Sequence, residues 1–245
     1  MKDSNPVPKA DARAMLKHWL RVSRPYLPLL ATAVVLTLIY LVTVKIPASY
    51  QQTQWISEFS RLFDLNDENN VPTWFSSFLW STAAYCCYRL RKVDQGASGR
   101  FRNSGYWLWL GVVCLLLSLD EVAQVHESVG SVAGHMGMHL PIYSWLPFGM
   151  AFVAVVAVGF SRFLWSLPRD IALAMIVAGA IFVTGAVGFE TLGALVDDHV
   201  LSTFPMGLSW HKEIAIEEFL EMLGVIVFIA ALDVHMRRIR WQSPG

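Results

Sequence analysis

Acidic residues occupy positions in this chain where a lipid-soluble segment rarely carries them. Two hydrophobic segments hold three acids each and a third segment holds one: Asp120, Glu121 and Glu127, then Glu217, Glu218 and Glu221, and finally Glu190. Charge inside a bilayer is costly, so intramembrane carboxylates usually face the interior of a helix bundle and serve a site. The sequence therefore predicts a buried acidic cluster in a membrane protein.

Seven neighbouring carboxylates cannot all stay ionised and unpaired in a medium of low dielectric constant. They can bind a metal ion, exchange protons, or pair with basic side chains. The third arrangement lacks partners, because Lys212, at the very edge, is the only Lys or Arg in the outer half of the three acidic segments. Metal binding and proton exchange are therefore the two favoured explanations.

Carboxylates with histidines in a helical bundle are the usual ligands of di-iron and di-manganese centres. The Glu-x-x-His pattern of those centres is absent, although Asp120-Glu121 is followed closely by His126-Glu127. A mixed set of His, Asp and Glu can also hold zinc with one position open for water. We therefore expect a divalent or transition metal, namely iron, zinc or manganese. The predicted ligands are Asp120, Glu121, His126, Glu190, Glu217 and Glu221, and the predicted catalytic acids are Glu127 and Glu218.

Other polar residues carry weaker signals. His135 and His139 have the i, i+4 spacing of helical ligands, but they lie in a glycine-rich segment and lack the Glu of a His-Glu-x-x-His motif. Glu213 is predicted to be a solvated acid in the first turn of a helix, where the helix dipole favours negative charge. Neither feature is included in the predicted site.

The elements that must position these acids are membrane-spanning helices. The chain is 55% hydrophobic and only 16% charged, whereas charged residues make up about a quarter of an ordinary soluble domain. A crossing needs about 20 mostly apolar residues. Six segments qualify, at 27–47, 72–90, 105–127, 146–166, 171–193 and 214–234, of which 72–90 is the weakest. The predicted fold is thus an all-α integral membrane bundle.

Loop charges predict the orientation of this bundle, because Lys and Arg concentrate in short cytoplasmic loops. With the N-terminus inside, sixteen of the 19 basic residues fall on the inner side, and only Lys45, Arg61 and Lys212 fall outside. Both termini are therefore predicted to be cytoplasmic, in the cell inner membrane. The expected organisation is a basic N-terminal segment at 1–26, a transmembrane domain at 27–234 and a basic tail at 235–245.

Helix geometry predicts that the acids share one layer. A rise of about 1.5 Å per residue places Asp120 about 22 Å, Glu221 about 21 Å and Glu190 about 28 Å above the inner face. On a regular helix Asp120 and Glu127 share a stripe, whereas His126 projects more than about 90° away. His126 is therefore expected to join the site only if the helix distorts near Gly130, or if the site is wide.

Small residues in segment 171–193 allow close contact with neighbouring helices. They are Gly179, Ala180, Gly185, Ala186, Gly188 and Gly193. This composition is typical of helix packing in general, and it also suits a central helix that brings Glu190 towards the other acids.

These features leave three functions open. A metal-dependent membrane enzyme would hydrolyse or oxidise a lipid or another hydrophobic small molecule on the outer side, with membrane lipids as its surroundings. A proton- or cation-coupled transporter or channel would use the same acids, although no internal repeat is visible. An accessory membrane subunit would use them to bind a partner helix. The zero net charge gives no basis for a nucleic-acid partner, and the chain contains no P-loop, dinucleotide fingerprint or Gly-x-Ser-x-Gly motif.

Overall fold

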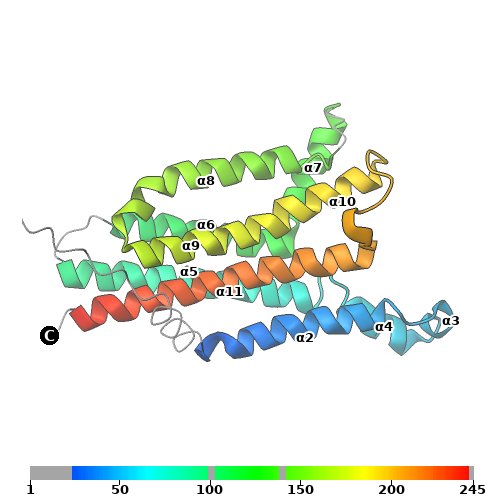
Figure 1. The fold of residues 1–245 in the computed structure, drawn as a ribbon, viewed down its shortest axis with the longest axis horizontal. Coiled ribbons are helices and arrows are strands. Elements are labelled where there is room, and N and C mark those ends of the chain that lie inside the picture. The colour runs from blue at the N-terminus through cyan, green and yellow to red at the C-terminus, as the bar shows by residue number, and fades with distance from the viewer. Residues whose placement is uncertain (1–23, 99–102, 138–141, 243–245) are drawn as a thin grey trace, which may run out of the picture.

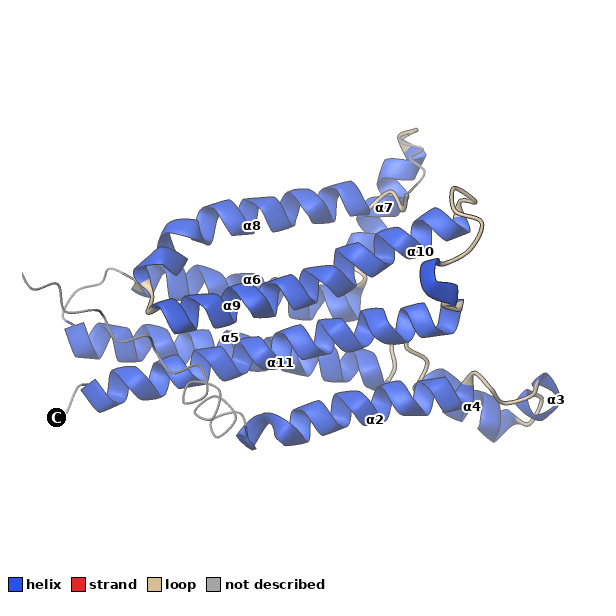
Figure 2. Cartoon of the chain, viewed as in Figure 1, coloured by secondary structure: helices blue, strands red, loops and turns tan. Residues whose placement is uncertain are grey.

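A computed structural model describes residues 24–98, 103–137 and 142–242, and these residues form helices and loops without strands (Figures 1 and 2). The all-helical prediction is thus confirmed for the described residues. Most of the predicted N-terminal segment and the side chain of His139 lie outside the described residues.

Among the described residues, six long helices form the bundle, and shorter helical elements extend or connect them. The long helices are α2 (Leu27–Thr43), α5 (Val71–Ser98), α6 (Ser104–Ala123), α8 (Leu146–Ser166), α9 (Arg169–Val183) and α11 (Trp210–Gln242). The shorter ones are η1 (Arg24–Tyr26), α3 (Ala48–Gln51), α4 (Gln54–Leu62), α7 (Val125–His135), the π-helical η2 (Thr184–Phe189), α10 (Glu190–Asp197) and η3 (Pro205–Gly207).

Four helical segments in the described part of the chain are long and apolar enough to cross a membrane. They are Arg24–Thr43, Ser104–Ala123, Leu146–Ser166 and Arg169–Asp197. Helices α5 and α11 are also long, at 28 and 33 residues, but their average hydrophobicity is much lower. The polar side chains of these two helices are therefore candidates for a functional site.

Helix α11 lies at the centre of the bundle, against α9, η2, α5 and α2. Its contact with α9 and η2 depends on two glycines. A Cβ atom at Gly224 would lie 2.7 Å from the backbone nitrogen of Phe182, and one at Gly185 would lie 2.7 Å from the carbonyl oxygen of Glu217. Larger residues at these two positions would therefore force the helices apart. Small residues thus allow segment 171–193 to pack close to the acidic face of α11.

Helices α5 and α6 pack along their length and share a polar contact within the apolar core. Ser77 and Ser81 of α5 each place Oγ 2.9 Å from Oγ of Ser118 on α6. Interhelical hydrogen bonds of this kind stabilise membrane bundles by about 0.6 kcal/mol each. The serines that weaken the hydrophobic signal of segment 72–90 thus hold it to its neighbour.

Helix α8 is the most weakly packed of the four apolar segments. Only 6% of its most apolar stretch is buried within the protein, compared with 22% or more in the other three. Figure 1 shows α8 and α2 at opposite edges of the bundle, with the remaining long helices between them. One side of the bundle is therefore tightly packed, and the α8 side is open.

One prediction about the helices is wrong. Segment 105–127 is not one regular helix, because α6 ends at Ala123 and Gln124 adopts a left-handed conformation with φ 51° before α7 begins. The stripe that was expected to align Asp120 with Glu127 therefore does not exist.

Candidate functional site

A cavity of about 1530 Å³ opens between α6, α8, α9 and α11. All the acids that the sequence singled out line it: Asp120, Glu121, Glu127, Glu190, Glu217, Glu218 and Glu221. His126 also lines it, together with Glu68, Glu213 and Trp145. Residues that are far apart in the sequence thus contribute carboxylates to one enclosed space.

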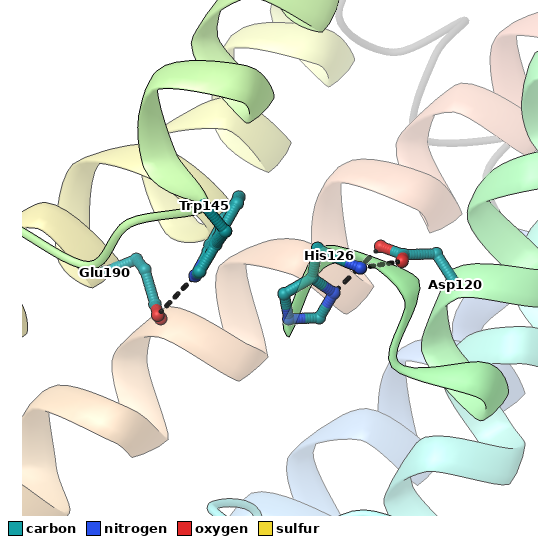
Figure 3. A network of polar contacts seen from close by, with 4 residues as sticks. All are labelled: Asp120, His126, Trp145 and Glu190. Atoms are coloured by element: carbon teal, nitrogen blue, oxygen red, sulfur yellow. Dashed lines mark hydrogen bonds and ion pairs between the residues drawn. The ribbon is translucent and has the colours of Figure 1, made fainter. Parts of the chain in front are cut away.

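The break at Gln124 brings His126 back onto Asp120. Oδ1 of Asp120 accepts a hydrogen bond from the backbone N–H of His126 at 2.9 Å, and Oδ2 lies 3.0 Å from Nδ1 of the same histidine. Figure 3 shows the imidazole held at this side by the carboxylate. The helix does distort, but at Gln124 rather than near Gly130.

This contact resembles the outer layer of many metal sites. Metal-binding histidines usually donate their second ring N–H to a carboxylate, which fixes the tautomer and the orientation of the ring. Because Nδ1 of His126 faces Asp120, Nε2 on the opposite side of the ring is the nitrogen left for a ligand. Asp120, which was predicted to be a ligand, is thus placed to orient one.

Three side chains offer atoms for a single metal ion. Ligand atoms of Glu68, His126 and Glu127 all lie within 4.8 Å of one another. Two ligands that bind one ion at about 2.1 Å are separated by no more than about 4.2 Å, so only a small adjustment is needed. One nitrogen and two carboxylates are a donor set that suits zinc, iron or manganese.

Glu68 is the member of this group that sequence reasoning missed. It lies in the loop between α4 and α5, and its Oε2 atom is buried without a hydrogen-bond partner among the described residues. Burial, followed by the charge of Glu127, raises the pKa of Glu68 to about 7. Its surroundings, an acidic loop between two helices, look in the sequence like ordinary solvated chain, so no signal marked it.

Trp145 connects the two walls of the cavity. Its ring lies edge-on to His126 with the ring centroids 4.8 Å apart, and its Nε1–H donates to Oε1 of Glu190 at 3.4 Å (Figure 3). Gly130 and Gly149 leave room for it, since a Cβ atom at either would lie within about 3.1 Å of the tryptophan. This residue was not among those predicted from the sequence to form the site.

Glu190 begins α10, directly after the π-helical turn η2. Single π-helical turns are rare and frequently occur at functional sites. The carboxyl group of Glu217 on α11 lies near those of Glu190 and Glu213. Neighbouring carboxyl groups favour a shared proton or a cation between them.

Glu213 corrects the sequence interpretation. It was predicted to be solvated, yet it is 1% exposed, and its Oε1 atom has no hydrogen-bond partner among the described residues. Gly193 on α10 leaves the space into which this carboxyl group fits. His211 and Lys212 in the same turn are exposed, but the side chain of Glu213 points inward against Gly193, so the position in the first turn was misleading.

The remaining predicted residues line the cavity outside the three-residue group. Glu121 and Glu218 lie close enough to interact electrostatically with each other, and Glu218 does so with Glu68 and His126 as well. Of the six predicted metal ligands, only His126 belongs to the group with ligand spacing, and Glu127 joins it from the predicted catalytic pair.

Comparison with known proteins gives one match. No curated protein and no solved structure matches the chain. A family model described as "Domain of unknown function (DUF8692)" matches residues 27–236, a range that includes every residue of the cavity discussed above. The chain therefore belongs to the DUF8692 family.

Proposed function

We propose that this protein is a metal-dependent membrane enzyme that hydrolyses a lipid or another hydrophobic substrate. The observation that carries the proposal is the grouping of Glu68, His126 and Glu127, with Asp120 holding Nδ1 of the histidine. A site with few protein ligands keeps a position open for water and substrate. The metal would be zinc, iron or manganese, bound in the acidic part of the cavity.

The proposed chemistry assigns distinct tasks to the protein residues. A bound ion would act as a Lewis acid and lower the pKa of water towards neutrality. Asp120 orients His126, while Glu68 and Glu127 supply oxygen ligands. Glu218, which lies on the facing helix within electrostatic reach of His126, would accept the proton of the attacking water and deliver it to the leaving group.

We further infer six membrane crossings with both termini on the inner side of the cell inner membrane. Helices α5 and α11 are long enough to span, and they lie inside the bundle beside apolar helices. Ser77 and Ser81 of α5 form hydrogen bonds with Ser118 of α6, and the acids of α11 line the cavity, so these polar groups have partners or polar surroundings within the bundle. The excess of Lys and Arg in the proposed inner loops supports the same orientation.

Metal analysis tests the enzymatic proposal. Purified protein from metal-supplemented cells should contain one transition ion per chain by mass spectrometry. Glu68→Gln, His126→Gln and Glu127→Gln should each lose it, because each removes one of three protein ligands. His135→Gln is a matched control on the same helix, since its ring contacts only the Ser131 carbonyl oxygen in the described structure. Folded protein without any bound metal would overturn the proposal.

One observation favours a second function, proton- or cation-coupled transport. Glu213, Glu217 and Glu221 follow one another at intervals of four residues along α11, so they form a continuous acidic row beside the cavity. Such rows can relay protons in pumps and carriers. Proton uptake into proteoliposomes that depends on Glu221 but not on His126 would favour transport over hydrolysis.

A further inference from the structure

The cavity consists of two chemically different sections. Its outer section carries the carboxylates described above, whereas its inner section is lined by hydrocarbon side chains such as Leu110, Phe152, Val156, Phe160, Met175 and Phe228. The total volume of about 1530 Å³ exceeds the roughly 300–1,000 Å³ of pockets for drug-sized ligands. A ligand that fills it must therefore be large and strongly amphiphilic.

The length of the cavity can be measured along α11. Glu217 and Phe228 both line the cavity and are eleven positions apart, which corresponds to about 16 Å along a helix. One leaflet of a bilayer has a hydrocarbon thickness of about 15 Å, half of the usual core. The cavity thus spans about one leaflet from Glu217 to Phe228, and α11 carries no acid between Glu221 and Phe228.

The α8 side of the bundle offers a route into this section. Helix α8 is the least buried of the apolar helices, and it contributes Phe152, Val156 and Phe160 to the cavity wall. A ligand dissolved in the bilayer can approach this wall without passing through water. The apolar section is therefore accessible to a lipid chain from the side.

The outer section favours a positively charged head group. No Lys or Arg lines the cavity among the described residues, while acids from α6, α7, α10 and α11 do. A phosphate or fatty-acid carboxylate would be repelled by this surface, because like charges raise the free energy strongly in a medium of low dielectric constant. An ammonium group would be attracted and would donate three hydrogen bonds.

Glu190, Glu213 and Glu217 form the place where such an ammonium fits, and we call these residues the acidic trio. Glu213 is 1% exposed, and its Oε1 atom lacks a partner among the described residues, so a donor is missing from this point. A buried carboxylate without a donor is costly, more so than a neutral polar group. The trio is not a second metal site of the same kind, since Glu68, His126 and Glu127 are the group in the described chain with ligand spacing.

We propose that the cavity binds a long-chain amine, with its ammonium group on the acidic trio and its hydrocarbon chain in the apolar section. That this amine is the substrate, or a part of it, rests on the function proposed above. The binding itself does not, because the acidic trio is separate from the proposed metal ligands. Trp145 lies between the two groups, so a bound head group would sit beside the metal.

A binding experiment without metal tests this proposal. The full-length protein, in lipid nanodiscs and treated with a chelator, is incubated with radiolabelled hexadecylamine, hexadecanol or hexadecanoic acid, and empty nanodiscs serve as the blank. The amine should bind saturably, at least tenfold more tightly than the alcohol, and the acid should not bind above the blank. Equal binding of the amine and alcohol, or no saturable amine binding, would overturn the proposal.

Two sets of variants locate the ligand. Glu213→Gln and Glu217→Gln should each weaken amine binding at least tenfold, whereas Asp198→Asn should leave it unchanged, because Asp198 is exposed outside the cavity. Gly179→Leu should weaken amine binding, because its side chain would occupy the space for the hydrocarbon chain, while Gly159→Leu should leave amine binding unchanged. A Cβ atom at either glycine meets no atom within 4 Å, but only Gly179 lines the cavity.

The same assay separates this proposal from the metal enzyme. His126→Gln should lose the metal and retain amine binding, because it leaves the acidic trio intact. If metal is absent from all variants while the amine binds, only the enzymatic proposal fails. If Glu213→Gln and Asp198→Asn bind the amine equally, the acidic trio is not the head-group site, whatever the metal content.

Discussion

The two walls of the cavity are built in opposite ways. On one wall, α11 meets α9 and η2 so closely that Gly185 and Gly224 leave no room for a Cβ atom. On the other wall, α8 buries only 6% of its most apolar stretch, and a Cβ atom at Gly159 would meet nothing. The difference indicates that the close-packed wall holds the acids in place, while the open wall leaves space for a ligand.

The largest expected effect comes from breaking the close-packed wall. Gly224→Leu should lower the free energy of unfolding by about 3 kcal/mol, because its side chain collides with the backbone of Phe182. Gly159→Leu on α8 should change it by less than about 0.5 kcal/mol. Thermal unfolding in detergent measures both. Similar losses in the two variants would remove the distinction between the walls.

The contact between Asp120 of α6 and His126 of α7, which belong to neither wall, should be sensitive in a different way. Asp120→Asn keeps the shape of the side chain but removes its charge, so it should weaken metal binding by about 10- to 100-fold. The unfolding temperature of the metal-free protein should remain near that of the parent. Chelator competition measures the affinity, and full affinity in Asp120→Asn would show that this carboxylate does not orient the histidine.

A smaller effect should come from the serine contact in the close-packed part of the bundle. Ser118→Ala removes the hydroxyl group that Ser77 and Ser81 share, and should cost about 1 kcal/mol of stability. The metal content should not change, since these serines are absent from the cavity lining. Unfolding and metal analysis of one preparation check both statements, and a loss of metal would link the two regions.

The smallest effect is expected at Trp145. Trp145→Phe keeps an aromatic ring between Gly130 and Gly149 but removes the Nε1–H donor to Glu190. That bond is long, at 3.4 Å, so its loss should cost no more than about 0.5 kcal/mol. Thermal unfolding against the parent protein measures it. A loss above 2 kcal/mol would mean that Trp145 holds the two walls together.

Much of this arrangement was accessible from the sequence. Long apolar segments predicted the helices, because a helix in a membrane must satisfy its own backbone and needs a fixed length. Arithmetic along those helices placed Asp120, Glu190 and Glu221 in one layer, and these residues do line one cavity. Such predictions hold wherever a helix is regular, since rise and rotation per residue are then constant.

The tertiary structure alone decided the composition of the candidate metal centre. Gln124 interrupts the helix, so the regular rotation that turned His126 away from Asp120 no longer applies. Glu68 arrives from a loop whose path depends on packing between distant segments, and Glu213 is buried because α10 covers the start of α11. The sequence determined which charged residues enter the bundle, through the cost of placing charge in lipid. Backbone breaks and long-range packing decided which atoms come into contact. Neither can be predicted from the local periodicity of the sequence.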